Sequence, residues 1–324
     1  MTKVGIIGTR HVHADGLAAN VELCGGTLVG AYEADADARA AWTRTELLEL
    51  DALLDASDAV IVAGTNRERV DHTLAASKAG VPVLAEKPVA ADADDLARLV
   101  AEADASLVMV ALPVRFAESL QRARAAITAG AIGTPIAGRG TNHGQFPGGW
   151  FGSKVDAGGG ALQDHVVHLG DALCWLLDDH VTHAYARSAH VLQPQNDVED
   201  CGVVTLDFAS GFFASIDSSW SRPESFPTWG DVWLEIVGTE GRLRIDPMAT
   251  HMELFDDSAG KLRHVGYSPD DMTRELVASF LRFVEDRPTQ APVSLREGIH
   301  ASDVVLAAYA SAASGHREPV TARG

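Results

Sequence analysis

The feature that most constrains the fold is a regular alternation of short apolar runs and helical patterns in the first third of the chain. Five apolar runs are expected to be buried strands, at Val4–Gly8, Thr27–Tyr32, Ala59–Ala63, Pro82–Ala85 and Leu107–Leu112. Helical patterns separate them, around residues 12–23, 44–54, 67–79 and 92–104. Such alternation is typical of a parallel sheet with helices on both faces. Residues 1–112 are therefore predicted to form one α/β domain.

After residue 112 the pattern changes, and residues 113–324 are predicted to form a second α/β domain. Helices are expected at about 115–129, 159–177, 270–286 and 296–315. Alternating, strand-like segments are expected at 135–145, 181–192, 202–208, 211–220 and 231–246. Turn residues between these segments indicate hairpins, so we expect an open, mostly antiparallel sheet.

Composition limits the partners and the compartment. The 324 residues carry a formal net charge of −19, which argues against nucleic acid and anionic membranes as partners. The three cysteines, Cys24, Cys174 and Cys201, are expected to be buried thiols in a reducing compartment. The chain starts directly with a strand-like segment and shows no apolar stretch of membrane-spanning length, so a cytoplasmic location is expected.

The loop after the first apolar run resembles part of a dinucleotide-binding fingerprint. Such a loop reads G-x-G-x-x-G and places a pyrophosphate at a helix N-terminus. Here Gly8, Thr9, Arg10 and His11 begin the loop, and Arg10 and His13 stand at the second and third glycine positions. Either the Arg10 guanidinium contacts a phosphate, or the loop has lost its phosphate site.

Glu33 follows the second apolar run and is a candidate to accept hydrogen bonds from the adenosine ribose hydroxyls. Asp35 and Asp37 follow it, and the first basic residue is Arg39, so a 2′-phosphate would be repelled. NAD is therefore favoured over NADP. The alternative is a solvated carboxylate at a strand end.

The neighbouring His11 and His13 are not expected to bind a metal ion. They lie two residues apart on a loop, and the sequence shows no third ligand nearby.

The helix at 159–177 places ionisable residues among apolar ones. Asp164, His168 and Asp171 share one of its faces. Buried charged groups are costly unless they are paired or functional, so the pattern indicates either a structural Asp–His bond or a catalytic site. His168 suits a general base that removes a hydroxyl proton, and Asp164 could orient its imidazole. Lys87 follows the fourth apolar run, at the sheet edge where ligands of such folds bind.

Two motifs resemble the signatures of the glucose–fructose oxidoreductase/inositol dehydrogenase (Gfo/Idh/MocA) family. The first is Glu86-Lys87-Pro88, and the second is the run GGGALQDHVVHLGD from Gly158 to Asp171, with Val166 in place of a glycine. Weaker similarities extend over nearly the whole chain. The resemblance implies a Rossmann domain at 1–112 and a substrate-binding and oligomerisation domain at 113–324.

The resemblance also implies an NAD(P)-dependent oxidoreductase that acts on a sugar, cyclitol or related polyol, and a homodimer or homotetramer paired through its open sheet. It assigns catalysis to Lys87, Asp164 and His168. The cofactor-binding residues that it implies are Gly8, Thr9, Arg10, His11, Glu33, Thr65, Asn66, Glu86 and Lys87. Substrate contacts are expected from Arg115, Trp150, His165 and Asp171. Trp150 could instead be a core anchor, His165 a packing residue, and Asp171 a brace for Lys87.

Three departures from the family pattern lie on the cofactor side. The phosphate loop lacks two glycines, Thr65-Asn66 replaces the more usual Pro-Asn, and Arg69 stands where a histidine is common. Two other functions therefore stay open. One is a redox-neutral enzyme that uses tightly held NAD transiently, for epimerisation, elimination or glycoside cleavage. The other is a non-catalytic binding or regulatory protein on the same fold.

Overall fold

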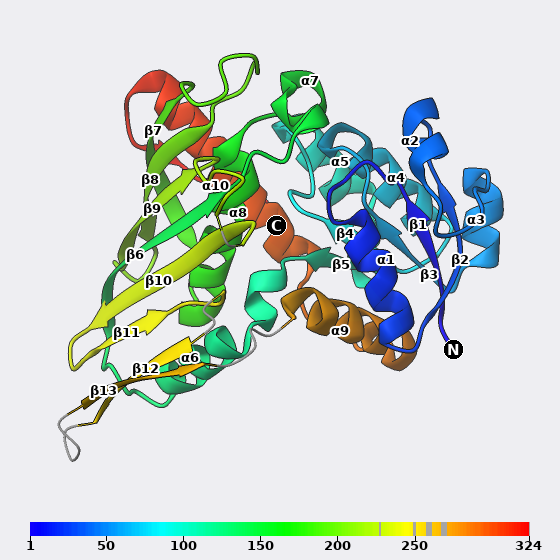
Figure 1. The fold of residues 1–324 in the computed structure, drawn as a ribbon. Coiled ribbons are helices and arrows are strands. Elements are labelled where there is room, and N and C mark those ends of the chain that lie inside the picture. Colours follow the sequence, from blue (N-terminus) through cyan, green and yellow to red (C-terminus); the bar gives the residue numbers. More distant parts are fainter. Residues whose placement is uncertain (227, 249–250, 257–260, 267–270, 324) are drawn as a thin grey trace.

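The protein consists of two sheets and the helices that flank them (Figure 1). The structure is a computed structural model that describes residues 1–226, 228–248, 251–256, 261–266 and 271–323. The smaller sheet is built from the N-terminal third of the chain, and the larger sheet forms the opposite side of the molecule. Helices and loops of both parts meet between them.

The first sheet has five parallel strands in the order β2-β1-β3-β4-β5, which confirms the α/β prediction. Its strands are β1 (Lys3–Ile7), β2 (Thr27–Tyr32), β3 (Ala59–Val62), β4 (Val83–Glu86) and β5 (Val108–Ala111). Every residue of β3, β4 and β5 is buried. Helices cover both faces of this sheet, so its strands are continuous apolar runs.

Helices α1 (Ala14–Leu23), α4 (Asn66–Lys78) and α5 (Ala93–Glu102) follow strands β1, β3 and β4. A capping box starts α4: the Thr65 hydroxyl accepts the Glu68 N–H, and the Glu68 carboxylate accepts the Thr65 N–H. The position of Thr65 at the end of β3 is therefore fixed by local hydrogen bonds.

The prediction of a helix at 44–54 is wrong about where that helix begins. The structure has two short helices in this region, α2 (Ala36–Ala41) and α3 (Leu50–Ala56). The Asp35 side chain caps α2, while residues 46–48 run beside β2 and exchange backbone hydrogen bonds with Ala31. Pairing with the sheet edge thus replaces the first turn of the expected helix.

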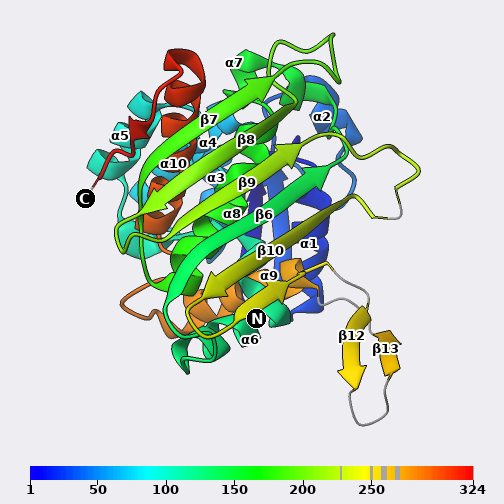
Figure 2. The same ribbon diagram turned by 90° about the vertical axis from the view of Figure 1, so that its left-hand side faces the viewer.

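The second sheet is mixed but mostly antiparallel, in the order β11-β10-β6-β9-β8-β7-β14. Its strands are β6 (Pro135–Gly144), β7 (Val181–Ala189), β8 (Cys201–Phe208), β9 (Phe213–Ser219), β10 (Gly230–Gly238), β11 (Arg242–Ile245) and β14 (Glu318–Pro319). The prediction that consecutive strands form hairpins is wrong at one point. Strand β6 lies between β9 and β10, and it pairs with β9 in parallel. A further hairpin, β12 (His251–Asp256) with β13 (Lys261–Gly266), stands apart from this sheet (Figure 2).

Helices α8 (Ala161–Leu177) and α10 (Leu295–Ser314) cover one face of the second sheet, and the other face is open (Figures 1 and 2). Helix α8 is buried at every position from Ala161 to Leu173, because the sheet, α10 and the N-terminal domain surround it. Helix α10 also contacts β5, so it joins the two sheets.

Helix α9 (Met272–Asp286) packs against the first sheet although it belongs to the C-terminal part of the chain. Its Val277 and Phe280 side chains are fully buried in one cluster with Ile6 and Leu17. The C-terminal part therefore completes the hydrophobic core of the N-terminal part. The division of the chain at residue 112 stays a prediction.

Short helical segments connect these elements. They are η1 (Ala105–Leu107), η2 (Pro113–Phe116), α6 (Glu118–Thr128), η3 (Gly149–Gly152) and α7 (Lys154–Ala157). The helix expected from residue 115 begins only at Glu118, because Ala117, in an extended conformation, ends the 3₁₀ turn η2 before α6 starts.

All three cysteines are free thiols, and each is partly rather than fully buried, which corrects the expectation of burial. Among the described residues, no helix is long and apolar enough to cross a membrane.

Candidate active site

A cavity of about 160 Å³ lies where the carboxyl end of β4 faces helix α8 and the second sheet. Polar residues from both parts of the chain line it, including His13, Lys87, Asn142, Asp164, His165 and His168. Apolar side chains such as Phe151 and Trp229 complete the wall. All three predicted catalytic residues therefore meet in this cavity, which we call the catalytic pocket.

Lys87 and Asp164 form a buried ion pair across the pocket. The Lys87 Nζ lies 2.6 Å from the Asp164 Oδ1 and 3.1 Å from the Asp164 carbonyl oxygen. The two side chains are 3% and 7% exposed, so water screens this contact weakly. The loop after β4 is thereby tied to the first turn of α8.

The second oxygen of Asp164 also has partners. Trp220 donates its indole N–H to Oδ2 at 3.0 Å, and the Nε2 of His165 lies 3.2 Å from the same atom. Burial alone would raise the pKa of Asp164, but the Lys87 ammonium and His165 hold it well below its usual value. Asp164 is thus an ionised group inside the protein.

His168 lies one turn after Asp164 on α8 and is 8% exposed. Burial, reinforced by the charge of Lys87, lowers its pKa well below the usual value, so its imidazole is neutral at pH 7. Its Nδ1 has no hydrogen-bond partner in the described part of the chain. The carboxylate of Asp164 bonds Lys87 and Trp220 instead, so the proposed Asp164–His168 hydrogen bond is not formed.

Arg115 and Asp171 lie apart from this pocket. The Asp171 carboxylate accepts two hydrogen bonds from Arg115, and Glu297 accepts a third. Burial would lower the pKa of Arg115, but these two carboxylates outweigh burial and raise it. The three residues line a separate cavity of about 660 Å³, between the end of α8 and the start of α10. The larger cavity therefore does not contain the predicted catalytic residues, and Asp171 braces Arg115 rather than Lys87.

The phosphate loop follows β1 and retains one glycine for a steric reason. Gly8 has a φ of +81°, and a Cβ atom on it would lie 2.4 Å from the Cα of Gly64. The side chain of Glu33 holds the next residue: its Oε2 accepts the Thr9 N–H at 2.6 Å and the Thr9 hydroxyl at 3.0 Å. Glu33 is 2% exposed, so the alternative of a solvated carboxylate is wrong.

Trp150 and Phe151, on η3, cover this loop from the second domain. Their rings are stacked at 4.0 Å, and the Trp150 indole donates a hydrogen bond of 3.0 Å to the Arg10 carbonyl. His11 packs against both rings and is 3% exposed. Phe151 lines the catalytic pocket. Trp150, by its hydrogen bond to the Arg10 carbonyl, links the two parts of the chain.

Arg69 is fully buried and explains one departure from the family pattern. Its guanidinium donates to the Asn66 side chain and the Pro88 carbonyl, both at 2.6 Å, and to the Gly64 carbonyl at 3.0 Å. Burial lowers its pKa to about 10. Arg69 thus fixes the loops after β3 and β4 relative to each other, while Asn66 bonds the Ala157 carbonyl of the second domain.

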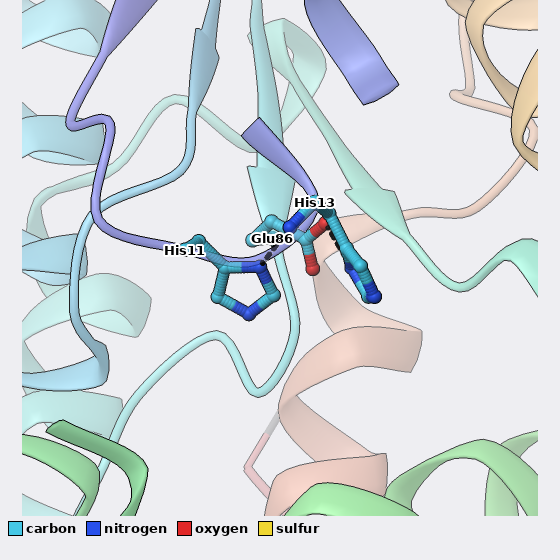
Figure 3. A group of neighbouring side chains, drawn as sticks. All are labelled: His11, His13 and Glu86. Carbon is cyan, nitrogen blue, oxygen red and sulfur yellow. Dashed lines mark hydrogen bonds and ion pairs between the residues drawn. The ribbon is translucent and has the colours of Figure 1, made fainter. Parts of the chain in front are cut away.

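The structure places a third possible metal ligand, the Glu86 carboxylate, beside His11 and His13. One nitrogen of each ring and one oxygen of Glu86 all lie within 4.8 Å of one another. Figure 3 shows the Glu86 carboxylate between the two imidazoles, with the His13 Nδ1 3.0 Å from Glu86 Oε1. The expectation that His11 and His13 lack a third possible ligand nearby is therefore wrong, because Glu86 comes from β4, far away in sequence.

Several residues with a role in the site were missed. The Glu199 carboxylate accepts the N–H groups of Gly160 and Leu162 and the Tyr309 hydroxyl, and so positions the start of α8. Asn142, on an inward-facing position of β6, donates to the His165 carbonyl. Asn142 could have been found from the sequence, because it is a polar residue on the buried face of a strand. No sequence signal indicates the contact of Trp220 with Asp164.

Comparison with known proteins agrees with this geometry. Residues 2–113 match the family described as "Oxidoreductase family, NAD-binding Rossmann fold", and residues 120–244 match its "GFO/IDH/MocA C-terminal domain". A 1,5-anhydro-D-fructose reductase of Ensifer adhaerens is 30% identical over 256 residues, which cover 75% of each chain. The chain belongs to the GFO/IDH/MocA oxidoreductase family.

Further relatives show the range of this family. Inositol 2-dehydrogenase 3 of Saccharopolyspora erythraea is 28% identical over 279 residues, covering 81% of this chain and 77% of the relative. A levoglucosan dehydrogenase solved in complex with NADH superposes with a TM-score of 0.82 at 22% identity, over 99% of both chains. These relatives are sugar and cyclitol oxidoreductases, and the last shows the same fold.

The residues around the phosphate loop fit a dinucleotide. Helix α1 has no side-chain cap. Its Ala14 N–H donates to the His11 carbonyl at 2.9 Å, and the other N–H groups of its first turn can bind an anion. The Arg10 guanidinium is partly exposed next to that turn and lies 4.0 Å from Glu68. Oε1 of Glu33 accepts one hydrogen bond, from Asp35 N–H, and retains a lone pair for a ribose hydroxyl.

We predict that Glu33→Ala weakens NAD binding roughly 10- to 100-fold, the size of a lost hydrogen bond to a charged group. The same change should reduce the discrimination against NADP, because it removes the buried negative charge. Calorimetric titrations with NAD and NADP measure both effects. Glu22→Ala, which removes an exposed carboxylate from the C-terminal end of α1, is the control and should leave both affinities unchanged. Tighter binding of NADP than NAD by the wild type would contradict the assignment.

Proposed function

We propose that the protein is an NAD-dependent dehydrogenase that oxidises a CH–OH group of a sugar, cyclitol or related polyol. The observation that carries this proposal is the convergence of Lys87, Asp164 and His168 in one buried pocket, at the carboxyl end of β4. The curated relatives supply the substrate class, since they act on anhydrofructose and inositol.

Each of the three residues has a separate task in this proposal. The neutral imidazole of His168 accepts the proton of the substrate hydroxyl. The Lys87 ammonium donates a hydrogen bond to the same oxygen and stabilises its developing negative charge. Asp164 keeps Lys87 in place and balances its charge. NAD would be held by Gly8, Thr9, Arg10, His11, Glu33 and the Thr65-Asn66 turn, and would accept the hydride from the substrate carbon.

Of the four predicted substrate residues, His165 has the strongest support. It lines the pocket, is 1% exposed and lies edge-on to Trp229. Arg115 and Asp171 line the other cavity, so we assign them a supporting role behind α8. Asn142 and Trp229 are the pocket residues that we add as candidate substrate contacts.

The first test removes the proposed base. His168→Ala should lower kcat by about 10²–10⁴-fold while NADH affinity, measured by fluorescence titration, stays unchanged. Lys87→Ala should lower kcat and also raise KM, because its charge contacts the reacting oxygen. His183→Ala, in β7, is a control for losing a partly buried imidazole elsewhere.

A panel of polyols with NAD supplies the assay. Wild-type turnover retained by both variants would overturn the mechanism. Cofactor retained through purification, without net NADH formation on any polyol, would instead favour the redox-neutral alternative. A protein that binds neither cofactor nor polyol would support the non-catalytic one.

The second test uses the pH dependence of the oxidation rate. The rate requires neutral His168, so it should fall as the pH drops through a pKa that lies below 6.5. Asp164 raises the pKa of His168 by its negative charge. Asp164→Asn should therefore move the acidic limb of the profile of kcat against pH to lower pH. A limb that stays in place, or moves to higher pH, would show that His168 is not the titrating base.

We also propose that the open face of the second sheet pairs chains into a homodimer or homotetramer. Large apolar side chains are exposed on it, among them Tyr185, Val203, Phe213 and Val237. Exposed apolar patches of this kind mark interaction surfaces. Sedimentation velocity should find an oligomer, and a monomer at micromolar concentration would contradict the proposal.

We also propose a separate role for each part of the chain and a cytoplasmic location. Residues 1–112 would bind the dinucleotide and residues 113–324 the substrate. The three free thiols suit the reducing cytoplasm, which fractionation of cells would test.

A further inference from the structure

The phosphate loop carries a side-chain cluster that takes no part in the proposed proton transfer, although His11 is also among the residues proposed to hold NAD. His11 and His13 stand on this loop, and Glu86 is the last residue of β4. The donor atoms of the three residues lie within 4.8 Å of one another. His13 occupies a position that is glycine in the usual dinucleotide-binding fingerprint, so the cluster coincides with a departure of this chain from that pattern.

The donor set is the kind that binds transition metals. Neutral imidazole nitrogens and carboxylate oxygens are ligands for Zn²⁺, Co²⁺ and related ions, and two histidines with one carboxylate form a known three-ligand arrangement with open positions. A metal at about 2.0–2.2 Å from each atom would bring the three donors closer together than the observed limit of 4.8 Å. Binding would therefore require rotation of these side chains.

The surrounding hydrogen bonds already orient the donors. The Lys87 N–H donates to Glu86 Oε2 at 3.0 Å, which leaves Oε1 facing His13. The His13 N–H donates to the His11 Nδ1 at 3.2 Å, so this nitrogen is turned to the centre of the cluster (Figure 3). The contacts that an ion would replace are the 3.0 Å His13–Glu86 bond and this 3.2 Å bond.

The charge of the cluster is also poorly balanced without an ion. His11 is 3% exposed, and the nitrogen that it turns to the cluster, Nδ1, accepts the His13 N–H at 3.2 Å. The nearest cations are directed to other groups: Lys87 to Asp164, and Arg69 to Asn66 and two carbonyl oxygens. Glu86 is 2% exposed, and among the described residues the only side chain that forms a hydrogen bond or ion pair with it is that of His13.

An ion could enter from the catalytic pocket. Both His11 and His13 line that pocket, next to Lys87 and His168. His13 is partly exposed there, so a ligand position on this side would be open to water or to a substrate oxygen.

We propose that His11, His13 and Glu86 form a binding site for one divalent transition-metal ion in the wall of the catalytic pocket. The site is separate from the Lys87–Asp164–His168 group, and its existence does not depend on the dehydrogenase proposal.

The test uses the full chain, produced without a polyhistidine tag and stripped with a chelator. Titration with Co²⁺ should produce visible d–d absorption bands that saturate at one ion per chain, and dialysis against Zn²⁺ followed by elemental analysis should give the same ratio. His13→Ala and Glu86→Gln should each weaken binding by at least about 10-fold, because each removes one ligand. Neither NAD nor substrate is present, so the result is independent of the activity.

His190→Ala is the matched control, since it removes an exposed imidazole far along the chain and should leave metal binding unchanged. Circular dichroism and melting temperature check that each variant is folded. Glu86→Gln preserves the size of the side chain and, through its amide oxygen, an acceptor for the Lys87 N–H, so it separates ligand loss from unfolding. No Co²⁺ or Zn²⁺ binding by the wild type, or equal binding by folded wild type, His13→Ala and Glu86→Gln, would overturn the proposal.

Discussion

The buried ion pair between Lys87 and Asp164 is the interaction on which the rest of the site depends. It joins the loop after β4 to the first turn of α8, and so joins the two parts of the chain. A buried pair adds little net stability, because desolvation offsets much of the attraction, but removing one partner costs about 3–5 kcal/mol by leaving an unpaired charge. The pair therefore acts mainly as a constraint on geometry, and Trp220 and the Asp164 carbonyl strengthen that constraint.

Contacts around this pair hold the two domains in one arrangement. Trp150 bonds the Arg10 carbonyl, and Asn66 bonds the Ala157 carbonyl. On the other side, α9 fills the core next to α1. The consequence for the pocket is electrostatic. His168 is kept neutral by burial and Asp164 is kept ionised by Lys87, so a neutral imidazole and an ionised carboxylate lie one helical turn apart.

In the phosphate loop, side chains stand at positions that are glycine in the usual fingerprint. Gly8 meets a steric demand from Gly64, and Thr9, His11 and His13 carry side chains that bond to neighbouring groups. Thr9 is held by Glu33, and His13 contacts Glu86. Replacing glycines here has not left an empty loop, because the new side chains form a polar cluster between β1 and β4.

Local patterns in the sequence were sufficient for the architecture. Continuous apolar runs and the helical stretches between them predicted the parallel sheet. These features depend on residues close together in sequence, where backbone geometry fixes the outcome. The helix at 44–54 failed because residues 46–48 pair with Ala31, a contact that no local pattern encodes.

The tertiary structure alone decided the partners of the charged side chains. Asp164 and Asp171 share a helix face in the sequence, yet one meets Lys87 and the other Arg115, 77 and 56 residues away. Glu86 joins His11 and His13 only because β1 and β4 end at the same edge of the sheet. The sequence by itself determined which elements form and which residue types they carry. Long-range packing decided which charges become neighbours, because a buried charge takes the partner that the fold brings within reach.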